Sequence, residues 1–328
     1  MKLQSDTITE LPKLYVPNLE TLDLSDCGEL VTVRELCAPN LVELILSYCY
    51  KLVTIHESVG SLDRLRIWEL RCCMSLQSLP NNLRLKSLVN FYLDNCSKLE
   101  KFPNILHQEM KCLKWLELSE SGIRELPSSI GYLTQLTGLW LDGSHNLRDL
   151  PDSIGYLTQL TLLFLDNCHN LRDLPDSIYK LQMLQHFSFD SAKLRPPCNS
   201  LDGLSEYGFL RLRELRFSGY RRVELEFLMK PNYFPVLRIL DLWNTDIVSI
   251  PESLNRFTTL ETLLIRNCQQ LRQILGLPQS IKILHANHCP SLDAQSSSRL
   301  LNQVSLFQVI IIKIKNKTKF FFFYNFLS

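Results

Sequence analysis

The motif Leu-x-x-Leu-x-Leu recurs along most of this chain and restricts its fold more than any other feature. Twelve segments carry the motif or a close variant, mostly 22 to 25 residues apart. A unit of this length cannot bury its apolar edge alone, so neighbouring units must stack to form a continuous core. The segments begin at Leu19, Leu41, Leu65, Leu88, Leu113, Leu136, Leu160, Leu184, Leu212, Leu237, Leu260 and Ile281.

The residue types within one unit predict its local structure. The alternation Leu-x-Leu has the period of a β-strand with one buried face. Six units then close with an apolar residue and a proline, as at Leu126-Pro127 and Leu150-Pro151. Proline lacks an amide hydrogen and has a fixed φ, so it ends strand pairing and starts a return limb. The next segment, such as SSIGYLTQ at 128–135, has room for only one or two helical turns.

Together these features predict an α/β solenoid of about twelve leucine-rich repeats. We expect a horseshoe with a parallel β-sheet on its concave face and short helical or irregular segments on its convex side. The predicted domains are a truncated lead-in at 1–18, the solenoid at 19–292 and the start of a post-repeat junction at 293–303. No polar capping segment precedes the first repeat, which is why the lead-in is interpreted as cut.

The last segment, 304–328, has a different composition. Of its 25 residues, 17 are Phe, Ile, Lys, Asn or Tyr, which A/T-rich codons encode. We therefore interpret it as a non-native tail, namely translated intron. The rival interpretation is an amphipathic tail that inserts into a membrane, but its longest apolar run is too short to span one. As protein, its phenylalanine run is an aggregation hazard.

Two adjacent repeats, 130–153 and 154–177, are almost identical. They differ only at Gly138/Leu162, Trp140/Phe164, Gly143/Asn167 and Ser144/Cys168. The residues that stacking requires are kept, and the first three differing positions are expected to point out of the concave sheet. The pair is interpreted as a recent duplication that kept its scaffold and altered its exposed face.

Composition excludes several classes of protein. The chain is 45% hydrophobic and 21% charged, as in ordinary folded proteins, and its net charge of +1 gives no electrostatic case for nucleic acid. Its start has no secretory leader, and no stretch has the 18 to 20 apolar residues of a membrane span. We expect a cytoplasmic or nucleocytoplasmic protein whose eleven cysteines are reduced.

Cysteines and histidines suggest chemistry that the repeat register disfavours. Stacked thiols could come within disulfide range, but equivalent positions point the same way, so we expect small buried turn residues. His285, His288 and Cys289 resemble half a zinc site, yet the register separates Cys289 in the turn from His285 on the strand face. His145 and His169 are expected to be surface polar groups. The cysteines that share one repeat position are Cys27, Cys49, Cys73, Cys96, Cys168, Cys268 and Cys289.

No catalytic motif is present, so we expect no enzyme activity, cofactor or metal. The phosphate-binding loop G-x-x-x-x-G-K-[ST], the dinucleotide fingerprint, the nucleophile elbow and the H-E-x-x-H motif are all missing from the sequence.

The concave face instead offers a surface for binding. Its expected central column is Asp23, Ile45, Glu69, Tyr92, Glu117, Trp140, Phe164, Ser188, Arg216, Asp241, Leu264 and His285. Aromatic residues cluster there, an acidic row runs beside them, and a mixed basic and aromatic patch follows. Exposed aromatics are enriched in binding hot spots. The alternative is that these side chains only cover the sheet by packing on one another. Trp68, in a leucine column, is expected to be core.

The predicted partner-binding residues are Tyr92, Trp115, Glu117, Trp140, Asp142, Phe164, Asp166, Arg216, Trp243 and Arg266. The acidic row is Asp94, Asp142, Asp166 and Asp190, and the mixed patch also includes Arg221 and Arg222.

The pattern L-x-x-L-x-L-x-x-C-x-x-L-x-x-L-P, with IRELPSSIGYL and NCSKLEKFPNI, resembles the repeat region of plant intracellular nucleotide-binding leucine-rich-repeat immune receptors. The segment 275–303 is similar to the last repeat and post-repeat junction of the class with an N-terminal TIR domain. The resemblance covers about 11–303, and the extracellular plant pattern N-x-L-x-G-x-I-P is absent.

This resemblance implies a fragment of an immune receptor that binds a pathogen effector or a guarded host protein and restrains a nucleotide-binding switch. The TIR domain and the switch are missing from this chain, so it cannot cleave NAD or bind ADP or ATP by the family's mechanism. The alternative function is a stand-alone leucine-rich-repeat adaptor or scaffold in signalling, and an enzyme is a distant third.

Overall fold

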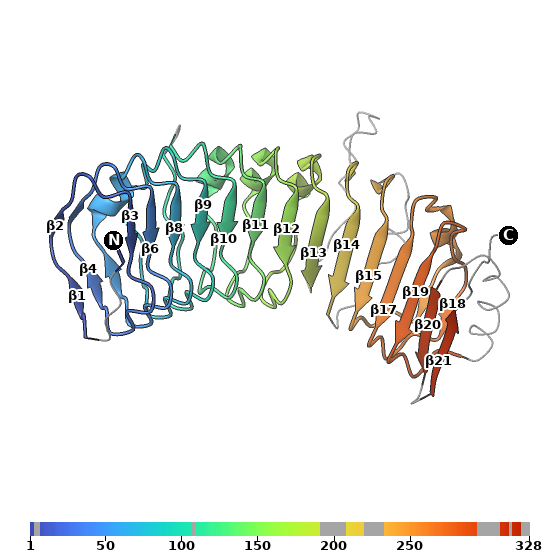
Figure 1. Cartoon of the computed structure of the whole chain (residues 1–328). Coiled ribbons are helices and arrows are strands. Elements are labelled where there is room, and N and C mark those ends of the chain that lie inside the picture. Colours follow the sequence, from blue (N-terminus) through green and yellow to red (C-terminus); the bar gives the residue numbers. More distant parts are fainter. Residues whose placement is uncertain are drawn as a thin grey trace, which may run out of the picture. The chain divides into compact units, whose positions relative to one another are not determined.

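The computed structural model describes residues 1–2, 7–106, 109–190, 208–219, 233–293, 309–314 and 317–322. The chain divides into two compact units, Met1–Leu181 and Gln182–Ser328, and each is described by itself. Both are built from stacked repeats whose longer strands pair side by side in a sheet, with further short strand pairs on the return limbs (Figure 1).

In the first unit, short parallel strands follow one another in chain order across the sheet. They are β3 (Thr21–Asp23), β6 (Glu43–Ile45), β8 (Ile67–Glu69), β9 (Asn90–Tyr92), β10 (Trp115–Glu117), β11 (Gly138–Trp140) and β12 (Leu162–Leu165). The return limbs carry the pairs β1 (Glu10–Leu11) with β4 (Thr32–Val33), β4 with β7 (Thr54–Ile55), and β2 (Leu14–Tyr15) with β5 (Leu36–Cys37).

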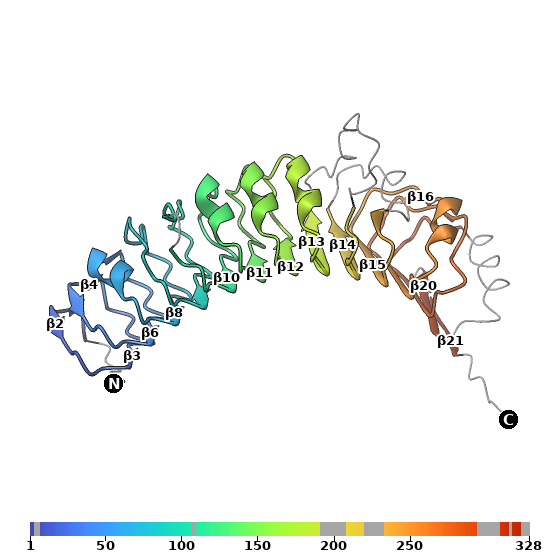
Figure 2. The same cartoon turned by 90° about the horizontal axis from the view of Figure 1, so that it is seen from above.

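Short 3₁₀ helices lie on the side of the first unit opposite the sheet, as Figure 2 shows for the three that follow β10, β11 and β12. They are η1 (Glu57–Ser61), η2 (Ser128–Tyr132), η3 (Asp152–Tyr156) and η4 (Asp176–Lys180). Pro127, Pro151 and Pro175 precede the last three of these helices with φ between −66° and −70°, the value that the ring imposes. The predicted role of proline in starting the return limb is confirmed.

The second unit repeats the same plan. Its parallel strands are β13 (His186–Asp190), β14 (Glu214–Ser218), β15 (Ile239–Trp243), β17 (Thr262–Arg266) and β19 (Ile283–Asn287). Its return limbs carry β16 (Ser249–Ile250), paired with β18 (Gln273–Ile274), and the 3₁₀ helix η6 (Glu252–Arg256). All twelve predicted Leu-x-Leu segments therefore occupy a sheet strand, which confirms the predicted fold class.

Two further strands follow the last repeat. β20 (Val309–Ile314) pairs with β19 in parallel, and β21 (Lys317–Phe322) pairs with β20 antiparallel. The interpretation of 304–328 as translated intron stays a prediction, as do the domain boundaries at 1–18, 19–292 and 293–303. Within the described ranges, no helix has the length and apolarity that crossing a bilayer requires.

A residue with a positive φ after the sheet strand turns the chain into its return limb. Its φ lies between 54° and 70° in most described repeats, as at Asp26, Tyr48, Asn95, Gly143 and Asn267, and is 113° at Gly219 after β14. Asn and Gly tolerate this conformation better than other residues do, whereas a residue such as Tyr48 pays a steric cost. The turn is thus set by stacking, not by local propensity alone.

The residue after each turn residue belongs to the predicted cysteine column. The side chains of this column form a ladder of hydrogen bonds inside the stack. In six repeats the cysteine donates a hydrogen bond to a carbonyl at the end of the previous strand or just after it, as from Cys96 Sγ to Leu70 O at 3.2 Å and from Cys73 Sγ to Leu46 O at 3.2 Å. Ser144 makes the equivalent bond to Leu118 O at 3.0 Å. The seven cysteines are buried and unbridged, which confirms their role as small buried turn residues.

Trp68 is fully buried, as predicted from its leucine column. Its ring stacks on Phe91 with the ring centroids 4.7 Å apart. Burial also affects Cys49, one thiol of the cysteine ladder. It raises the pKa of Cys49 to about 12, so this thiol stays protonated at neutral pH and can donate its hydrogen bond.

The ladder predicts which substitutions of Cys96 are tolerated. Cys96→Ser keeps a small donor, as Ser144 does naturally, and is expected to cost less than 1 kcal/mol, roughly the difference between two weak hydrogen bonds. Cys96→Ala removes the donor and leaves a void, and is expected to cost about 2 kcal/mol. Urea unfolding of the three chains measures the difference. Equal losses would show that the side-chain hydrogen bond contributes nothing.

Candidate functional site

The predicted aromatic cluster forms on the sheet face of the first unit. The ring centroids of Trp115 and Trp140 are 5.4 Å apart, and those of Trp140 and Phe164 are 5.8 Å apart with nearly parallel planes. The register places Trp140 beside Phe164 and Trp115 beside Gly138. We call these three residues, Trp115, Trp140 and Phe164, the aromatic shelf. All three remain half-buried, so each keeps some surface for a partner.

Gly138 makes room for the shelf. A β-carbon at this position would lie 2.4 Å from Cζ3 of Trp140 and 2.8 Å from Cε3 of Trp115. The Trp140 indole therefore lies across β11, where any other side chain would project. Gly138 thus lies on the same sheet face as Trp115, but it is buried because the Trp115 and Trp140 rings cover it.

This geometry explains the four differences between the duplicated repeats. The first repeat combines Gly138 with the large ring of Trp140. The second repeat combines the larger Leu162 with the smaller ring of Phe164. Gly143 and Asn167 occupy the same left-handed turn, with φ of 70° and 59°. The expectation that this position points out of the sheet is wrong, because it lies in the turn beyond the strand. Ser144 and Cys168 both donate into the ladder. Only the first two differences alter the sheet face.

Tyr92 and Glu117 meet a residue that the sequence did not single out, Arg71. The Arg71 guanidinium carbon lies 4.1 Å from the centroid of the Tyr92 ring. Its Nη1 donates to Asp94 Oδ1 at 2.8 Å, and its Nη2 lies 3.1 Å from Glu117 Oε2. One cation thus joins three successive repeats. The sequence does carry a signal for this contact. Arg71 occupies the same repeat position as the acidic row, one repeat before Asp94, so stacking places a basic side chain beside that carboxylate.

The carboxyls of this cluster are held in a partly desolvated site. Burial raises the pKa of Asp94 above its ordinary value, and burial likewise raises that of Glu117, although Arg71 draws both downward. Tyr92, next to them, also has a raised pKa because of burial. Arg71 therefore offsets the repulsion and the desolvation of two carboxylates.

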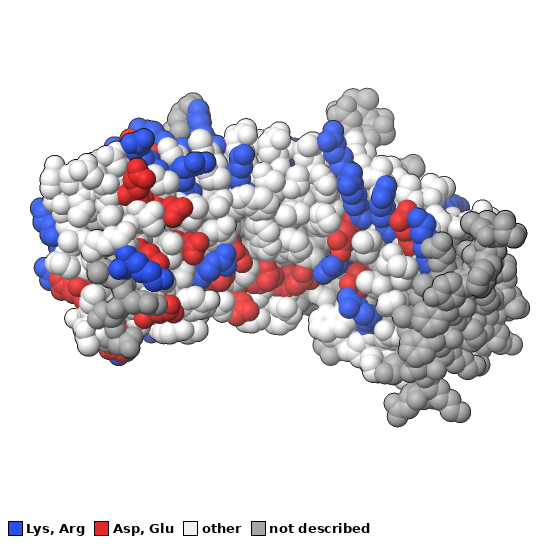
Figure 3. All heavy atoms as spheres, viewed as in Figure 1, with Lys and Arg blue, Asp and Glu red and all other residues white. Residues whose placement is uncertain are grey.

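The acidic row continues past Arg71 along one rim of the shelf. Asp142 follows β11 and Asp166 follows β12, and both are half-buried. Asp142 Oδ1 accepts a hydrogen bond from Ser119 Oγ at 2.8 Å. In Figure 3, acidic side chains gather near the lower rim in the middle of this face. The side chain of Asp190 lies outside the described part of the chain.

The mixed patch lies in the second unit, and its described arginines pair with neighbouring acids. Arg216 Nε donates to Glu214 Oε1 at 2.6 Å, and Arg266 Nη2 donates to Asp241 Oδ2 at 2.5 Å. Trp243 is 45% exposed. Arg221 and Arg222 lie outside the described residues. Because Arg216 and Arg266 are paired internally, the described part of this patch is less basic than its sequence suggests.

Two members of the predicted exposed column are buried. Asp241 is 2% exposed and its carboxylate pairs with Arg266, and Ser188, which is in register with Arg216, is 1% exposed. The expectation that both are accessible is therefore wrong. Burial raises the pKa of Asp241, although its hydrogen bond with Arg266 opposes the shift.

The half zinc site is separated as its register predicts. Cys289 is buried, His285 lies on β19, and His288 is exposed in the left-handed turn with a φ of 55°. In the part of the chain that the structure describes, no three His, Cys, Asp or Glu side chains converge as metal ligands would. His145 and His169 are exposed, and their rings stack with centroids 5.1 Å apart.

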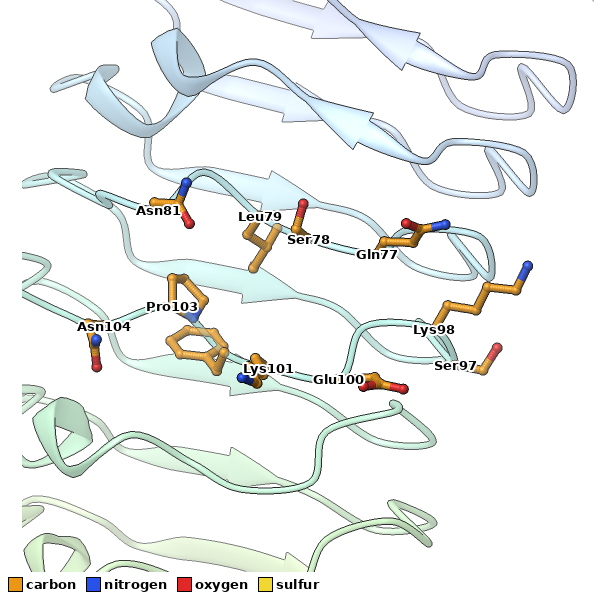
Figure 4. Close-up of a pocket in the computed structure, with 11 residues that line it drawn as sticks. Gln77, Ser78, Leu79, Asn81, Ser97, Lys98, Glu100, Lys101, Pro103 and Asn104 are labelled. Carbon is orange, nitrogen blue, oxygen red and sulfur yellow. The ribbon is translucent and has the colours of Figure 1, made fainter.

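An open pocket lies between the return limbs of the third and fourth repeats, where no 3₁₀ helix forms in the described residues. In Figure 4, Leu79 and Pro103 face the gap between the limbs, whereas Lys98 extends away at the turn. Two of its polar groups are already engaged, Asn81 with Glu57 and Glu100 with Arg124. The pocket is lined by Gln77, Ser78, Leu79, Asn81, Ser97, Lys98, Glu100, Lys101, Phe102, Pro103 and Asn104.

The first prediction from this site concerns Gly138. Gly138→Leu should displace the Trp140 indole from β11 and destabilise the fold by about 2 kcal/mol, as overpacking does. Adding Trp140→Phe recreates the pair of the second repeat and should restore most of that loss. Urea unfolding of the two single variants, the double variant and the parent chain completes the cycle. Strictly additive losses would show that the two positions are independent.

The second prediction concerns Arg71. Arg71→Met leaves Asp94 and Glu117 partly buried without their cation, and should cost about 1–3 kcal/mol at pH 7.5. Because burial holds both folded-state pKa values above their ordinary values of 3.8 and 4.5, protonation favours the folded state. The loss should therefore shrink as the pH falls toward 5.

Arg124→Met is the control, because Arg124 and its partner Glu100 are both about half exposed, at 52% and 51%. It should cost little at either pH. A loss in Arg71→Met that is the same at pH 7.5 and pH 5 would contradict the assignment of buried carboxylates to this cluster.

Comparison with known proteins agrees with the repeats. The family model described as "Leucine-rich repeat region" matches residues 91–222. The chain is 33% identical over 277 residues to a probable disease resistance protein of Arabidopsis thaliana. The aligned region covers 84% of this chain and 15% of that protein. It is 31% identical over 306 residues to TMV resistance protein N of Nicotiana glutinosa. That aligned region covers 86% of this chain and 25% of the tobacco protein.

Among solved structures, a leucine-rich-repeat protein of Leptospira interrogans matches with a TM-score of 0.40 and 18% identity, covering 95% of each chain. This chain spans a quarter or less of the length of the two plant relatives. By its stacked repeats and its similarity to those relatives, the chain belongs to the leucine-rich-repeat family of plant disease resistance proteins.

Proposed function

We propose that this chain is the protein-recognition module of an intracellular plant immune receptor of the TIR class. It binds a pathogen effector or a guarded host protein and restrains a nucleotide-binding switch located elsewhere in the receptor. The module is not an enzyme and acts in the cytoplasm or the nucleocytoplasm. The similarity to disease resistance proteins supports this role, and the face of the sheet supplies its mechanism.

The aromatic shelf is the observation that carries the proposal. Three large rings remain half-buried on a sheet that has no helix over this face in the described residues. Leaving such surface in water costs free energy that partner binding recovers, and aromatic anchors dominate the energetics of protein interfaces. The rings stack on one another, so they lose little side-chain entropy when a partner binds.

The rest of the site fits the same role. Arg71 fixes Tyr92 and Glu117 beside the shelf, which gives a rigid polar rim around an apolar centre. The sheet strands are short and tied to their neighbours on both sides, so the surface is formed before any partner arrives. Binding therefore requires little rearrangement of this chain.

The test compares proteins that the chain captures from leaf extract with and without the shelf. Trp115→Ala combined with Trp140→Ala should leave the fold intact and reduce capture of specific partners at least about tenfold, as loss of hot-spot residues does. Tyr156→Ala, an exposed aromatic residue on η3 and outside the predicted binding set, is the matched control and should retain capture. Thermal unfolding confirms that each variant is folded. Capture that is unchanged in the double variant would show that the shelf is not the recognition surface.

A further inference from the structure

We propose that the second unit carries a further interaction surface, which binds an acidic amphipathic segment of a partner protein. The surface lies where the chain enters β14 and β15. It consists of Leu210, Arg211, Arg213, Val236 and Arg238, and we call it the entry rim. It does not include any residue of the aromatic shelf, so the two surfaces can be tested separately.

The repeat register brings the arginines of the entry rim together. Arg213 directly precedes β14 and Arg238 directly precedes β15, and Arg238 N donates a hydrogen bond to Arg213 O at 2.9 Å. Neighbouring strands lie about 4.8 Å apart, so the two side chains leave the sheet next to each other. Arg211 lies two residues before Arg213, and all three arginines are exposed. In Figure 3, basic side chains gather near the upper ends of β14 and β15.

Two exposed apolar side chains lie among these arginines. The turns before the two strands close with backbone hydrogen bonds of the same kind, so Arg211 and Val236 occupy equivalent positions in neighbouring repeats. Val236 is 38% exposed, and Leu210, beside Arg211, is 43% exposed. The entry rim thus combines positive charge with apolar surface. The two turn hydrogen bonds are Leu212 N to Phe209 O at 3.2 Å and Leu237 N to Phe234 O at 3.3 Å.

The stack itself does not require this combination of residues. The equivalent turn positions are Thr-Gln at 134–135 and again at 158–159, and the position before the strand is Thr137 in the first of these repeats. Like charges on neighbouring strands repel each other, so Arg213 beside Arg238 costs free energy without improving the packing of the repeats. An anionic group of a partner offsets that repulsion.

The spacing of the arginines suits carboxylates that lie one helical turn apart. Side chains at i and i+4 of a helix have their Cβ atoms about 5 to 6 Å apart, close to the separation of neighbouring strands. Arginine can bind a carboxylate through two parallel hydrogen bonds. A partner helix with Glu at i and i+4 therefore places one carboxylate on Arg213 and the next on Arg238. An apolar side chain of the same helix packs on Leu210 or Val236.

Nucleic acid fits this surface less well than an acidic peptide does. Strong binding to nucleic acid uses about 6 to 10 phosphate contacts. The entry rim instead interleaves its arginines with Leu210 and Val236, whose exposed surface matches the apolar side of an amphipathic helix. The favoured partner is therefore a protein segment.

A synthetic peptide tests this on the whole chain. Its helix carries Glu at i and i+4 and Leu on the adjoining face. A second peptide has Gln in place of Glu, and a third has Ser in place of Leu. Fluorescence anisotropy should show saturable binding of the first peptide, and each of the other two should bind about tenfold more weakly because one half of the contact is lost.

The arginines are then tested with Arg213→Gln combined with Arg238→Gln. Affinity for the acidic peptide should fall about tenfold at 50 mM salt and less at 500 mM, because salt screens exposed charge pairs. The matched control is Arg256→Gln combined with Arg272→Gln, which removes the same charge from exposed positions on η6 and on the return limb after β17. It should leave the affinity unchanged.

Four outcomes overturn the inference. They are no binding of the acidic peptide to the parent chain, a change of less than twofold in the rim variant, an equal loss in the control variant, and tighter binding of a polyuridine oligonucleotide through the same arginines. The third indicates a net-charge effect and the fourth a nucleic-acid surface. Circular dichroism and thermal unfolding of each variant exclude misfolding as the cause.

The proposed function stands or falls separately. Trp115→Ala combined with Trp140→Ala should bind the acidic peptide as the parent chain does, because the shelf lies on β10, β11 and β12 of the first unit. Loss of the acidic peptide in that variant contradicts the assignment of this binding to the entry rim.

Discussion

In a stack of repeats, the nearest neighbour of each side chain is its own counterpart one strand away. Parallel strands lie about 4.8 Å apart, so every column of the repeat becomes a continuous row of side chains. A column of leucines becomes a core, a column of cysteines becomes a hydrogen-bonded ladder, and a column of exposed residues becomes a surface. Most other features of this chain depend on that single constraint.

The constraint gives the scaffold and the surface different tolerances to change. A core column must match its neighbours in size, as shown where Trp68 in one repeat is accompanied by Phe91 in the next. A turn column needs a residue that accepts a positive φ, and a ladder column needs a small donor. The sheet face has no such requirement, so its residues can vary with little effect on folding, provided that neighbours compensate as Gly138 does for Trp140.

The fold could be predicted from the sequence because it depends on the spacing of the leucines, which can be counted along the chain. Leucine periodicity fixed which residues of each repeat occupy a strand, and register then followed from stacking, which correctly placed Trp68 in the core and the aromatic residues on one face. What the sequence could not supply was how far each side chain reaches. Arg71 spans three repeats, the Trp140 ring covers Gly138, and Arg266 covers Asp241, and each depends on side-chain conformation.

Those same long-reaching side chains decide which parts of the face remain available to a partner. In the second unit, Arg216 pairs with Glu214 and Arg266 pairs with Asp241, so these two cations are satisfied within the chain. In the first unit, Arg71 holds Asp94 and Glu117 in the same way, whereas the aromatic shelf beside them keeps part of its surface exposed. Side chains that pair with one another serve the fold, and aromatic surface that stays exposed can be buried by another molecule. By this reasoning the aromatic shelf, Trp115, Trp140 and Phe164, is where this chain has most to gain from a partner.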